Sequence, residues 1–507
     1  MKRFSALFGI LSRPVTAGCA AAVLLSAALL SAAEPEAYDY GDEPMRYLKN
    51  DRVTLGIDLS IGGAVTWLSD EANGGENMIN SSDWGRQIQL SYYSGPVPYI
   101  GPNGEQPHEA WRNLGWNPIQ SGDCGNFRSK VTAFKEIGKN KMAVRTVPML
   151  WPNQNLPAEC VFECVYSLMP NGFVLDATIK NARSDTNQYP AMRQEIPAIY
   201  TNGPWYKLVT YMGDEPFKKK PVTVLIDKGD GKGWPWINYY NPERWSALVD
   251  ENGMGLGVYQ PESTRTTAGF FGGDELKGIG GAKDGQTGYI APLSMMILDH
   301  NITRTYRAYF IVGSIDEIRS RVYKLAKKGL SEMPEWVFDG DRHNWIYEGS
   351  ARDGGYPIDG CLDVSFDDSP QGGIDGPETF WEAEKAPVLE IDAELLLDGA
   401  EPGEETNLTA HFAPVSPRDM VDDIKWPLNP EQEKAKAERA EKYPVLPGFS
   451  APIPIAADGT RGTWSVDLSR YDAYKGAMKA FTIGLPPRKG EIKIYSIRLT
   501  RPGRRAK

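Results

Sequence analysis

Short β-rich runs separated by turn signals recur along most of the chain, and this pattern limits the folds that are open to it. The runs cover residues 53–59, 63–68, 142–150, 161–168, 173–181 and 304–312. Asn171-Gly172 and Asn252-Gly253 stand between such runs, and this dipeptide favours the positive φ angles of a tight hairpin turn. Because hairpins join antiparallel strands, the pattern predicts an all-β protein of stacked antiparallel sheets rather than alternating βαβ units.

One amphipathic helix is expected after the last of these runs. Ser314 and Glu317 have the spacing of a capping box, in which each residue bonds the backbone of the other. The apolar positions that follow have helical spacing: Ile315, Ile318, Val322 and Leu325. Gly329 and Pro334 then provide a stop signal. The helix therefore marks the end of a first domain, which we predict to span residues 34–333.

A chain of 507 residues is too long for one ordinary hydrophobic core, so a second domain is expected. Residues 334–375 are rich in Gly, Asp and Pro, which predicts a connector. Further strands are expected at 388–397, 407–413, 463–468, 480–485 and 492–499. They predict a smaller β-sandwich over residues 376–507. The charged, Ala-rich run 432–442 is typical of a solvated surface helix.

The N-terminus has the features of a secretory signal peptide. Lys2 and Arg3 precede an apolar run over residues 17–30, and the small residues 31–33 suit cleavage before Glu34. The run is too short and too rich in Ala for a membrane span, and no later segment is apolar enough to be one. We therefore expect residues 1–33 to be removed and the mature protein to be secreted or periplasmic.

Charge and cysteine spacing narrow the set of partners. The net charge of −11 argues against nucleic acid or an anionic membrane, because either would need a basic surface. The four cysteines after the signal are Cys124, Cys160, Cys164 and Cys361. Their spacing does not fit a structural zinc site, and an oxidising compartment would permit disulfides whose pairing the sequence leaves open. No metal and no cofactor is expected.

The segment 77–96 combines amides, a guanidinium and aromatic rings, as sugar-binding sites do. Alternation along it places Ile88, Leu90 and Tyr92 on one face, and Gln87, Gln89 and Ser91 on the other. A pyranose needs hydroxyl partners at its rim and an apolar platform beneath it. The residues expected to supply both are Arg86, Gln87, Gln89 and Tyr92. The alternative is an ordinary half-buried strand.

A loop over residues 115–123 is a second candidate, because its Pro and two Gly fix an irregular path while polar side chains stay available. Its predicted ligand-binding residues are Trp116, Asn117, Gln120 and Asp123. His108 lies just upstream and is expected to form another wall of the same pocket. The alternative is an Asx-turn network in which Asp123 and Asn117 only hold the loop.

Two further segments complete the candidate site. If residues 193–200 are extended, Glu195 lies beside Arg193, which would keep the carboxylate ionised. A buried Arg/Glu pair that anchors the segment is the alternative. The segment 233–245 is the densest aromatic patch, and Trp234 and Trp236 flank a proline that stiffens the backbone. These tryptophans are expected either to form a sugar platform or to belong to the core.

Residues 47–330 resemble the galactose-mutarotase-like superfamily. The resemblance is carried by the strand and Gly-Gly turn of residues 53–69, by Asn77-Met-Ile-Asn80 and by residues 255–259. It implies a β-supersandwich that acts on or binds carbohydrate. The paired histidines and late glutamate of the mutarotases could not be placed in this sequence, so sugar epimerisation is not expected. The tail, residues 380–502, is similar to β-sandwich modules appended to polysaccharide-degrading enzymes.

These observations predict a secreted carbohydrate-active enzyme whose partner is an oligo- or polysaccharide. Glycoside hydrolysis needs two carboxyl groups, and we assign Glu195 as base or nucleophile and Asp123 as acid, with Asp83 and Glu243 in reserve. Two alternatives remain. A polysaccharide lyase would use Tyr92 or His108 as base, and would neutralise a uronate with Arg86, Gln89 and Asn117. A non-catalytic carbohydrate-binding protein would use the same residues for recognition only. The oligomeric state stays open.

Overall fold

The computed structural model describes residues 36–185, 187, 189–212, 216–227, 236–272, 284–298, 300, 302–326, 333–354, 358–370, 372–379, 381–414, 434, 437–438, 441 and 447–501. Three expectations fall wholly or largely outside these residues: the signal peptide over residues 1–33, the surface helix over residues 432–442, and the platform residue Trp234.

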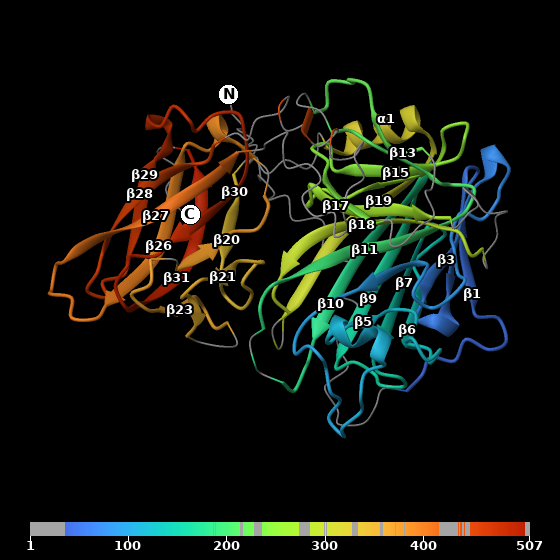
Figure 1. Ribbon diagram of the computed structural model, residues 1–507, viewed down its shortest axis with the longest axis horizontal. Helices are drawn as coiled ribbons and strands as arrows, with labels where there is room; N and C mark the ends of the chain where they lie inside the picture. Colours follow the sequence, from blue (N-terminus) through green and yellow to red (C-terminus); the bar gives the residue numbers. More distant parts are fainter. Residues whose placement is uncertain are drawn as a thin grey trace, which may run out of the picture. The chain divides into compact units, whose positions relative to one another are not determined.

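Two large antiparallel sheets form the first part of the fold, coloured blue to yellow in Figure 1. The first sheet has the order β1 (Met45–Lys49), β2 (Val53–Asp58), β3 (Ala64–Asp70), β4 (Ile88–Ser91), β11 (Met192–Asn202), β18 (Thr287–Met296), β17 (Arg265–Phe271) and β14 (Ile237–Tyr240), and β5 (Pro118–Ile119) and β8 (Met149–Leu150) join it beside β4. The second has the order β13 (Thr223–Ile226), β12 (Lys207–Thr210), β15 (Trp245–Val249), β16 (Met254–Tyr259), β19 (Thr303–Ser314), β10 (Gly172–Asn181), β9 (Cys160–Met169), β7 (Lys141–Val147) and β6 (Lys130–Glu136).

The core of this part lies between the two sheets. Ile88, Leu90 and Tyr92 of the first sheet are buried there, as alternation along β4 predicts. The Tyr92 ring packs against Phe162 of β9 with ring centroids 5.5 Å apart. Phe173 and Phe310 stack in parallel within the second sheet, 4.3 Å apart. Such dense apolar burial from both sheets is the main stabilising term of a β-sandwich.

Both expected hairpins are present. β9 turns into β10 with Gly172 opposite Met169, and β15 turns into β16 with Gly255 opposite Val249. Gly172 must be glycine, because a Cβ there would lie 1.9 Å from the carbonyl oxygen of Phe310 on β19. Asn-Gly at this turn thus serves two purposes: it allows the turn, and it lets the next strand approach closely.

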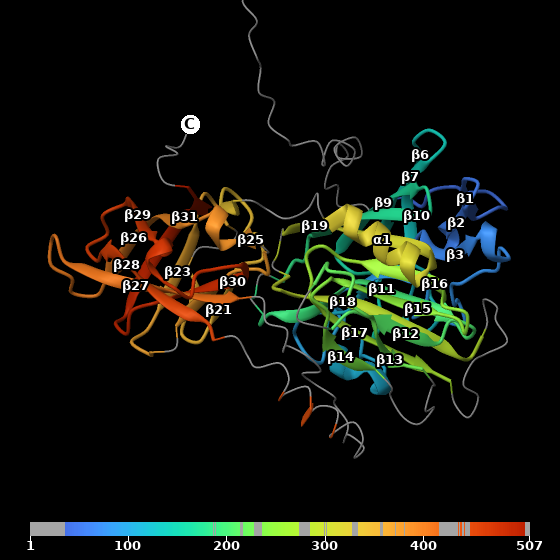
Figure 2. The same ribbon diagram turned by 90° about the horizontal axis from the view of Figure 1, so that it is seen from above.

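The expected helix is α1 (Ile315–Ala326), and its capping box forms as predicted. The backbone N–H of Ser314 donates to Glu317 Oε2 at 2.9 Å, and the N–H of Glu317 donates to Ser314 Oγ at 3.2 Å. α1 lies beside β16 of the second sheet (Figure 2). Its Ile318 and Val322 are fully buried in a cluster with residues of β15, β16 and β19 that is separate from the main core. The helix therefore covers an apolar face that would otherwise meet water.

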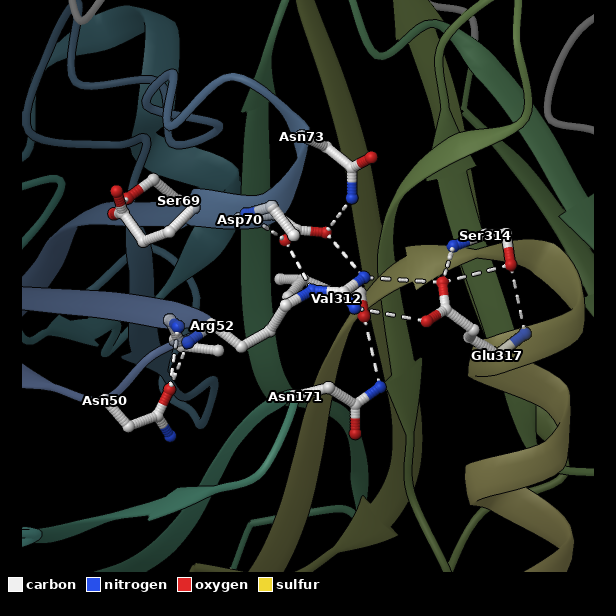
Figure 3. Close-up of polar contacts among 12 residues, drawn as sticks. Asn50, Arg52, Ser69, Asp70, Asn73, Asn171, Val312, Ser314 and Glu317 are labelled. Carbon is white, nitrogen blue, oxygen red and sulfur yellow. Dashed lines mark hydrogen bonds and ion pairs between the residues drawn. The ribbon is translucent and has the colours of Figure 1, made fainter.

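Arg52, at the start of β2, links the first sheet to this helix (Figure 3). Its Nε and Nη2 donate to the two carboxylate oxygens of Asp70 at 2.6 and 3.0 Å, and Nη1 and Nη2 donate to Glu317 at 3.2 and 3.3 Å. The side chain of Asp70 is fully buried, whereas that of Glu317 is 44% exposed. The Asp70 arm is therefore expected to contribute more, because water screens it less.

Replacing Arg52 by Ala is expected to lower the free energy of unfolding by about 1–2 kcal/mol, since buried Asp70 loses two charge-assisted hydrogen bonds. Urea titration followed by tryptophan fluorescence measures the change. Arg470→Ala is the matched control, because Arg470 pairs with Asp467 while its side chain is 80% exposed. Equal losses for the two variants would contradict the role given to Arg52.

Two further antiparallel sheets form the second part, coloured orange to red in Figure 1. One has the order β22 (Arg352–Asp353), β23 (Leu362–Phe366), β31 (Gly490–Thr500), β26 (Val388–Leu397) and β29 (Gly462–Asp467), with β20 (Glu335–Val337) beside β31. The other has the order β21 (Ile346–Glu348), β24 (Gly373–Asp375), β30 (Ala477–Gly484), β27 (Glu405–Pro414) and β28 (Phe449–Ala456), with β25 (Trp381–Glu382) beside β30. The all-β fold class, a large antiparallel sandwich followed by a smaller one, is thus confirmed.

The segment 334–375 differs from the expected connector, because its short strands belong to both sheets of the smaller sandwich. β23 pairs with β31 along its whole length, and β24 pairs with β30. Trp345 and Phe338 from the same segment are fully buried in the second core. Turn residues break the segment into strands of two to five residues, which is why its composition is that of a loop.

Candidate active site on the first sheet

Side chains from neighbouring strands meet on the face of the first sheet that points away from the core. Ile196 and Ile199 of β11 point into the core, so alternation turns Glu195 and Tyr200 to the opposite face. β4 and β18 flank β11 and contribute side chains to the same face. The Glu195 cluster, as we name it, consists of Ser91, Tyr93, Glu195, Tyr200, Trp236 and Tyr289.

Glu195 is half-buried at the centre of this cluster, and tyrosine hydroxyls bind its carboxyl group. Tyr289 donates to Glu195 Oε1 at 2.5 Å and Tyr93 donates to the same atom at 3.1 Å. Burial raises the pKa of Glu195 above its ordinary value, although the hydroxyls of Tyr289, Tyr93 and Ser91 act in the opposite direction. Glu195 therefore keeps its proton to a higher pH than an exposed glutamate.

The backbone around Glu195 is irregular, and buried amides hold it in place. The pairing register of β11 shifts after Glu195, as in a β-bulge. The side-chain amide of Gln260 donates to the carbonyl of Ile196 at 3.0 Å, so this carbonyl has a partner. The amide of Gln194 accepts from the N–H of Tyr93 and donates to its carbonyl, both at 2.7 Å. These amides position Glu195 and Tyr93 for their contact.

An aromatic wall stands beside the carboxyl group. The ring of Tyr289 lies between those of Tyr200 and Trp236, with ring centroids 4.8 Å away on each side. Tyr289 is buried, whereas Tyr200 and Trp236 are partly exposed. Partly exposed aromatic rings thus stand beside a carboxyl group of raised pKa, so the cluster offers a flat apolar surface next to a potential proton donor.

A second carboxylate, Asp83, lies near enough to Tyr200 for its charge to act on the Tyr200 hydroxyl. Asp83 Oδ2 is 3.1 Å from Nε of Arg86, whose Nη1 also donates to the carbonyl of Gly285 at 3.1 Å. Burial raises the pKa of Tyr200 well above its usual value; Glu195 and Asp83 raise it further and Arg86 lowers it. The charges of both carboxyl groups therefore act on the same hydroxyl. Arg86, predicted to bind sugar, lies at the edge of the cluster.

Asp123 is placed elsewhere, and its carboxylate binds backbone N–H groups of its own loop and of Asn155. Oδ1 accepts from the backbone N–H groups of Gly125 and Phe127 at 2.8 and 3.0 Å, and Oδ2 accepts from that of Asn155 at 2.6 Å. Burial raises the pKa of Asp123, although these three N–H groups lower it. In the part of the chain that the structure describes, no contact joins Asp123 to Glu195. The turn-network alternative for this loop is the one that the geometry supports.

The other residues predicted on this loop are buried and hold the backbone. Gln120 accepts from the N–H of Leu90 at 3.1 Å, and Asn117 donates to the carbonyl of Tyr92 at 2.6 Å. Trp116 is fully buried with the guanidinium of Arg183 4.6 Å from its ring centre. None of the three is exposed, so they support the site rather than contact a ligand.

Three residues predicted on the segment 77–96 are likewise inside the protein. Tyr92 has no exposed surface, and burial raises the pKa of its hydroxyl, which makes it unsuitable as the base of a lyase. Gln87 donates to the carbonyl of Asp83 at 2.7 Å, and Gln89 donates to that of Trp84 at 3.0 Å. Alternation assigned the faces of this strand, but loops cover the polar face.

Three predicted residues keep some exposure. Arg193 is exposed on β11 two residues before Glu195, yet the hydrogen bonds on Glu195 come from tyrosine hydroxyls. His108 is exposed, and its Nδ1 accepts from the N–H of Ala110 at 3.2 Å as a cap. Trp236 is partly exposed and packs against Tyr289 in the Glu195 cluster.

Sequence reasoning missed the tyrosines that surround the acid. Tyr93 is 102 positions from Glu195, and Tyr289 is 94 positions from it. The only local signal was Tyr93 itself, which follows Tyr92 and therefore points to the opposite face. The pairing of β11 with β4 and β18 brings these residues together.

The described residues contain no group of three His, Cys, Asp or Glu side chains that could hold a metal ion. Cys124, Cys160, Cys164 and Cys361 are free thiols in this structure. Helices of the described part lack the length and hydropathy needed to cross a membrane.

Comparison with known proteins gave matches among solved structures only: no protein-family model and no curated protein matches the chain. A galactose mutarotase-like protein from Lactobacillus casei is 11% identical, with 53% of this chain and 99% of that chain covered and a TM-score of 0.34. A putative aldose 1-epimerase from Escherichia coli is 7% identical (54% and 99% covered, TM-score 0.31), and a GH36 alpha-galactosidase from Geobacillus stearothermophilus is 9% identical (55% and 41% covered, TM-score 0.32).

These three structures are only 7 to 11% identical to the chain, and a fold does not determine the reaction that a protein carries out.

Proposed function

We propose that the protein is a carbohydrate-active enzyme, specifically a glycoside hydrolase, in which Glu195 donates the proton to the departing sugar. The observation that carries this proposal is the half-buried Glu195 carboxyl, held by Tyr289 and Tyr93 beside partly exposed aromatic rings. A general acid must be protonated at the working pH, and a raised pKa provides this.

The two tyrosines determine which oxygen of Glu195 can react. Both hydroxyls donate to Oε1, so the second oxygen, Oε2, is the one that carries the proton toward substrate. As the proton leaves, negative charge develops on the carboxyl group, and the two hydroxyl donors stabilise it. Burial thus favours the proton before transfer, and the tyrosines favour its loss during transfer.

Asp83 takes the second carboxylate role in this proposal. It is exposed and paired with Arg86, and its charge acts on the Tyr200 hydroxyl, as that of Glu195 does. In hydrolysis, the second carboxylate activates water or attacks the sugar directly, and the distance between the two carboxyl groups decides which. The sequence assigned Glu195 as base or nucleophile and Asp123 as acid. In this proposal Glu195 is the acid and Asp83 is its partner, because the carboxylate of Asp123 binds the backbone N–H groups of Gly125, Phe127 and Asn155.

A lyase is less well supported by the same cluster. A lyase needs a base for the C5 proton, and here the available groups would be Tyr93, Tyr200 and Tyr289. Burial raises the pKa of each well above its usual value, so none forms a tyrosinate readily. A protonated carboxyl beside aromatic rings serves hydrolysis better.

The experiment is an assay of the purified protein on neutral and anionic polysaccharides: laminarin, xylan, galactan, polygalacturonate, alginate and hyaluronate. We expect new reducing ends without the ultraviolet absorbance of unsaturated sugars. Absorbance that rises together with the reducing ends would identify a lyase and overturn the proposal. Binding of a polymer with no bond cleavage would identify a carbohydrate-binding protein and overturn it equally.

A further inference from the structure

Three tryptophans on segments that connect strands are partly exposed: Trp84, Trp111 and Trp151. The rings of Trp111 and Trp151 meet edge to face, with centroids 5.7 Å apart. Gly85 follows Trp84 and packs against the Trp151 ring, because a Cβ at Gly85 would lie 3.0 Å from Cη2 of that ring. We call these three residues the tryptophan row.

The row begins where the Glu195 cluster ends. The carbonyl of Gln87 accepts from the N–H of Tyr200 at 3.0 Å, so the two backbones are in direct contact. Gly85 is two residues before Gln87, which is at most about 7 Å along an extended chain. Asp83 binds the N–H of Gly85 at 2.8 Å and pairs with Arg86. The segment 83–87 therefore leads from Tyr200 to the ring of Trp151.

Buried polar groups fix the backbone of the row. The carbonyl of Trp84 accepts from the Gln89 amide at 3.0 Å and from the Ser121 hydroxyl. The N–H of Trp151 donates to the carbonyl of Asn117 at 2.8 Å, and its carbonyl accepts from the N–H of Cys124 at 3.2 Å. The loop 115–123 and the amide Gln89 thus hold the tryptophans in place.

We propose that the tryptophan row binds further sugar units of the substrate, so that a glycan chain runs from Glu195 past Gly85 to Trp151 and Trp111. The inference rests on the proposed function, because Glu195 marks the bond that is cleaved. It makes the substrate an oligo- or polysaccharide, whose affinity grows with chain length.

The chemistry around the row fits a glycan. An indole face is a flat apolar surface that suits the apolar face of a pyranose, and hydroxyls at the rim of the sugar need charged or polar partners. The guanidinium of Arg128 lies 5.7 Å from the centre of the Trp84 ring, and Asp83 is exposed at the other end of the same turn. Gly85 has no side chain, which lets the Trp151 ring pack closely against the backbone beside Trp84.

Affinity electrophoresis in native gels that contain one of the six polysaccharides tests the row without any need for turnover. We expect at least one polymer to retard the wild-type protein, and Trp111→Ala and Trp151→Ala each to weaken this binding roughly tenfold. Trp151→Phe keeps most of the packing, and its affinity for the polymer is expected to lie between those of the wild type and Trp151→Ala. Tyr47→Ala is the matched control, because Tyr47 is a 47% exposed aromatic residue on β1, away from the row.

A second measurement uses short and long oligosaccharides prepared from the polymer that binds best. The loss caused by Trp111→Ala is expected to be larger for the long chains. Equal losses for short and long chains, unchanged binding in both tryptophan variants, or a wild-type protein that no polymer retards would each overturn the inference. Polymer binding that needs the tryptophans, in a protein that cleaves nothing, would leave the row in place and remove the hydrolase.

Discussion

Replacing Glu195 by Gln is expected to lower kcat/KM roughly a thousandfold on the polysaccharide that the wild-type protein cleaves. Gln has nearly the same shape and can still accept from Tyr289 and Tyr93, but it has no proton to give to the departing sugar. Initial rates from reducing-end release give the ratio. Glu405→Gln, at an exposed position on β27, is the control and is expected to leave the rate unchanged.

The pH profile separates an acid from a residue that merely supports the fold. Since the pKa of Glu195 is raised, the rate is expected to fall as pH increases through that raised value. Tyr289→Phe removes a hydrogen bond that lowers the pKa, so the fall is expected to move to higher pH. If the fall in rate at high pH did not shift in Tyr289→Phe, another group would be the acid.

The pH dependence of protein stability reports the ionisation of Glu195 independently of activity. A carboxyl whose pKa is higher in the folded than in the unfolded protein stabilises the fold below the unfolded value, near that of an ordinary glutamate, and this contribution is lost as pH rises through the folded value. Glu195 has a raised pKa, so the wild type is expected to lose stability relative to Glu195→Gln over that range. If the melting temperatures of the wild type and Glu195→Gln changed in parallel across this pH range, burial would not be raising the pKa of Glu195.

Local sequence signals predicted the elements that short segments determine by themselves. The Asn-Gly turns and the Ser314/Glu317 capping box each act within a few residues, and the structure contains the hairpins and the helix that they imply. The short strands between 334 and 375 depend instead on β30 and β31, which lie more than a hundred residues later. Strands of two to five residues carry too little alternation to be read alone.

In the candidate site, too, sequence signals identified some features and missed others. Glu195 and Trp236 were predicted from their own segments, and the structure places both in the Glu195 cluster. Gln89 and Asn117 were assigned to the ligand because polar residues on a strand or loop normally face water. Here they bind backbone carbonyls of Trp84 and Tyr92, and sequence alone does not distinguish a polar group that meets a ligand from one that meets the backbone.

Replacing Glu243 by Ala is expected to lower the free energy of unfolding by about 3–5 kcal/mol. Glu243, a reserve catalytic candidate from the sequence, is fully buried and holds α1 against the second sheet. Its oxygens accept from Arg319 at 2.9 and 3.0 Å, from Tyr323 at 2.6 Å and from the Trp245 indole at 2.8 Å. Alanine would leave a buried guanidinium without its counter-charge, and urea denaturation measures the loss.

Two further variants test whether the loss comes from the unpaired charge. Glu109→Ala removes one member of an exposed ion pair with Arg112 and is expected to change stability little, because water screens that pair. The double variant Glu243→Leu/Arg319→Met removes both charges and is expected to recover much of the stability lost in Glu243→Ala, since an apolar pair can replace a buried ion pair. If the double variant were as unstable as Glu243→Ala, the cost would lie in packing and in the remaining donors, Tyr323, Trp245 and the N–H of Phe217, rather than in the charge of Arg319.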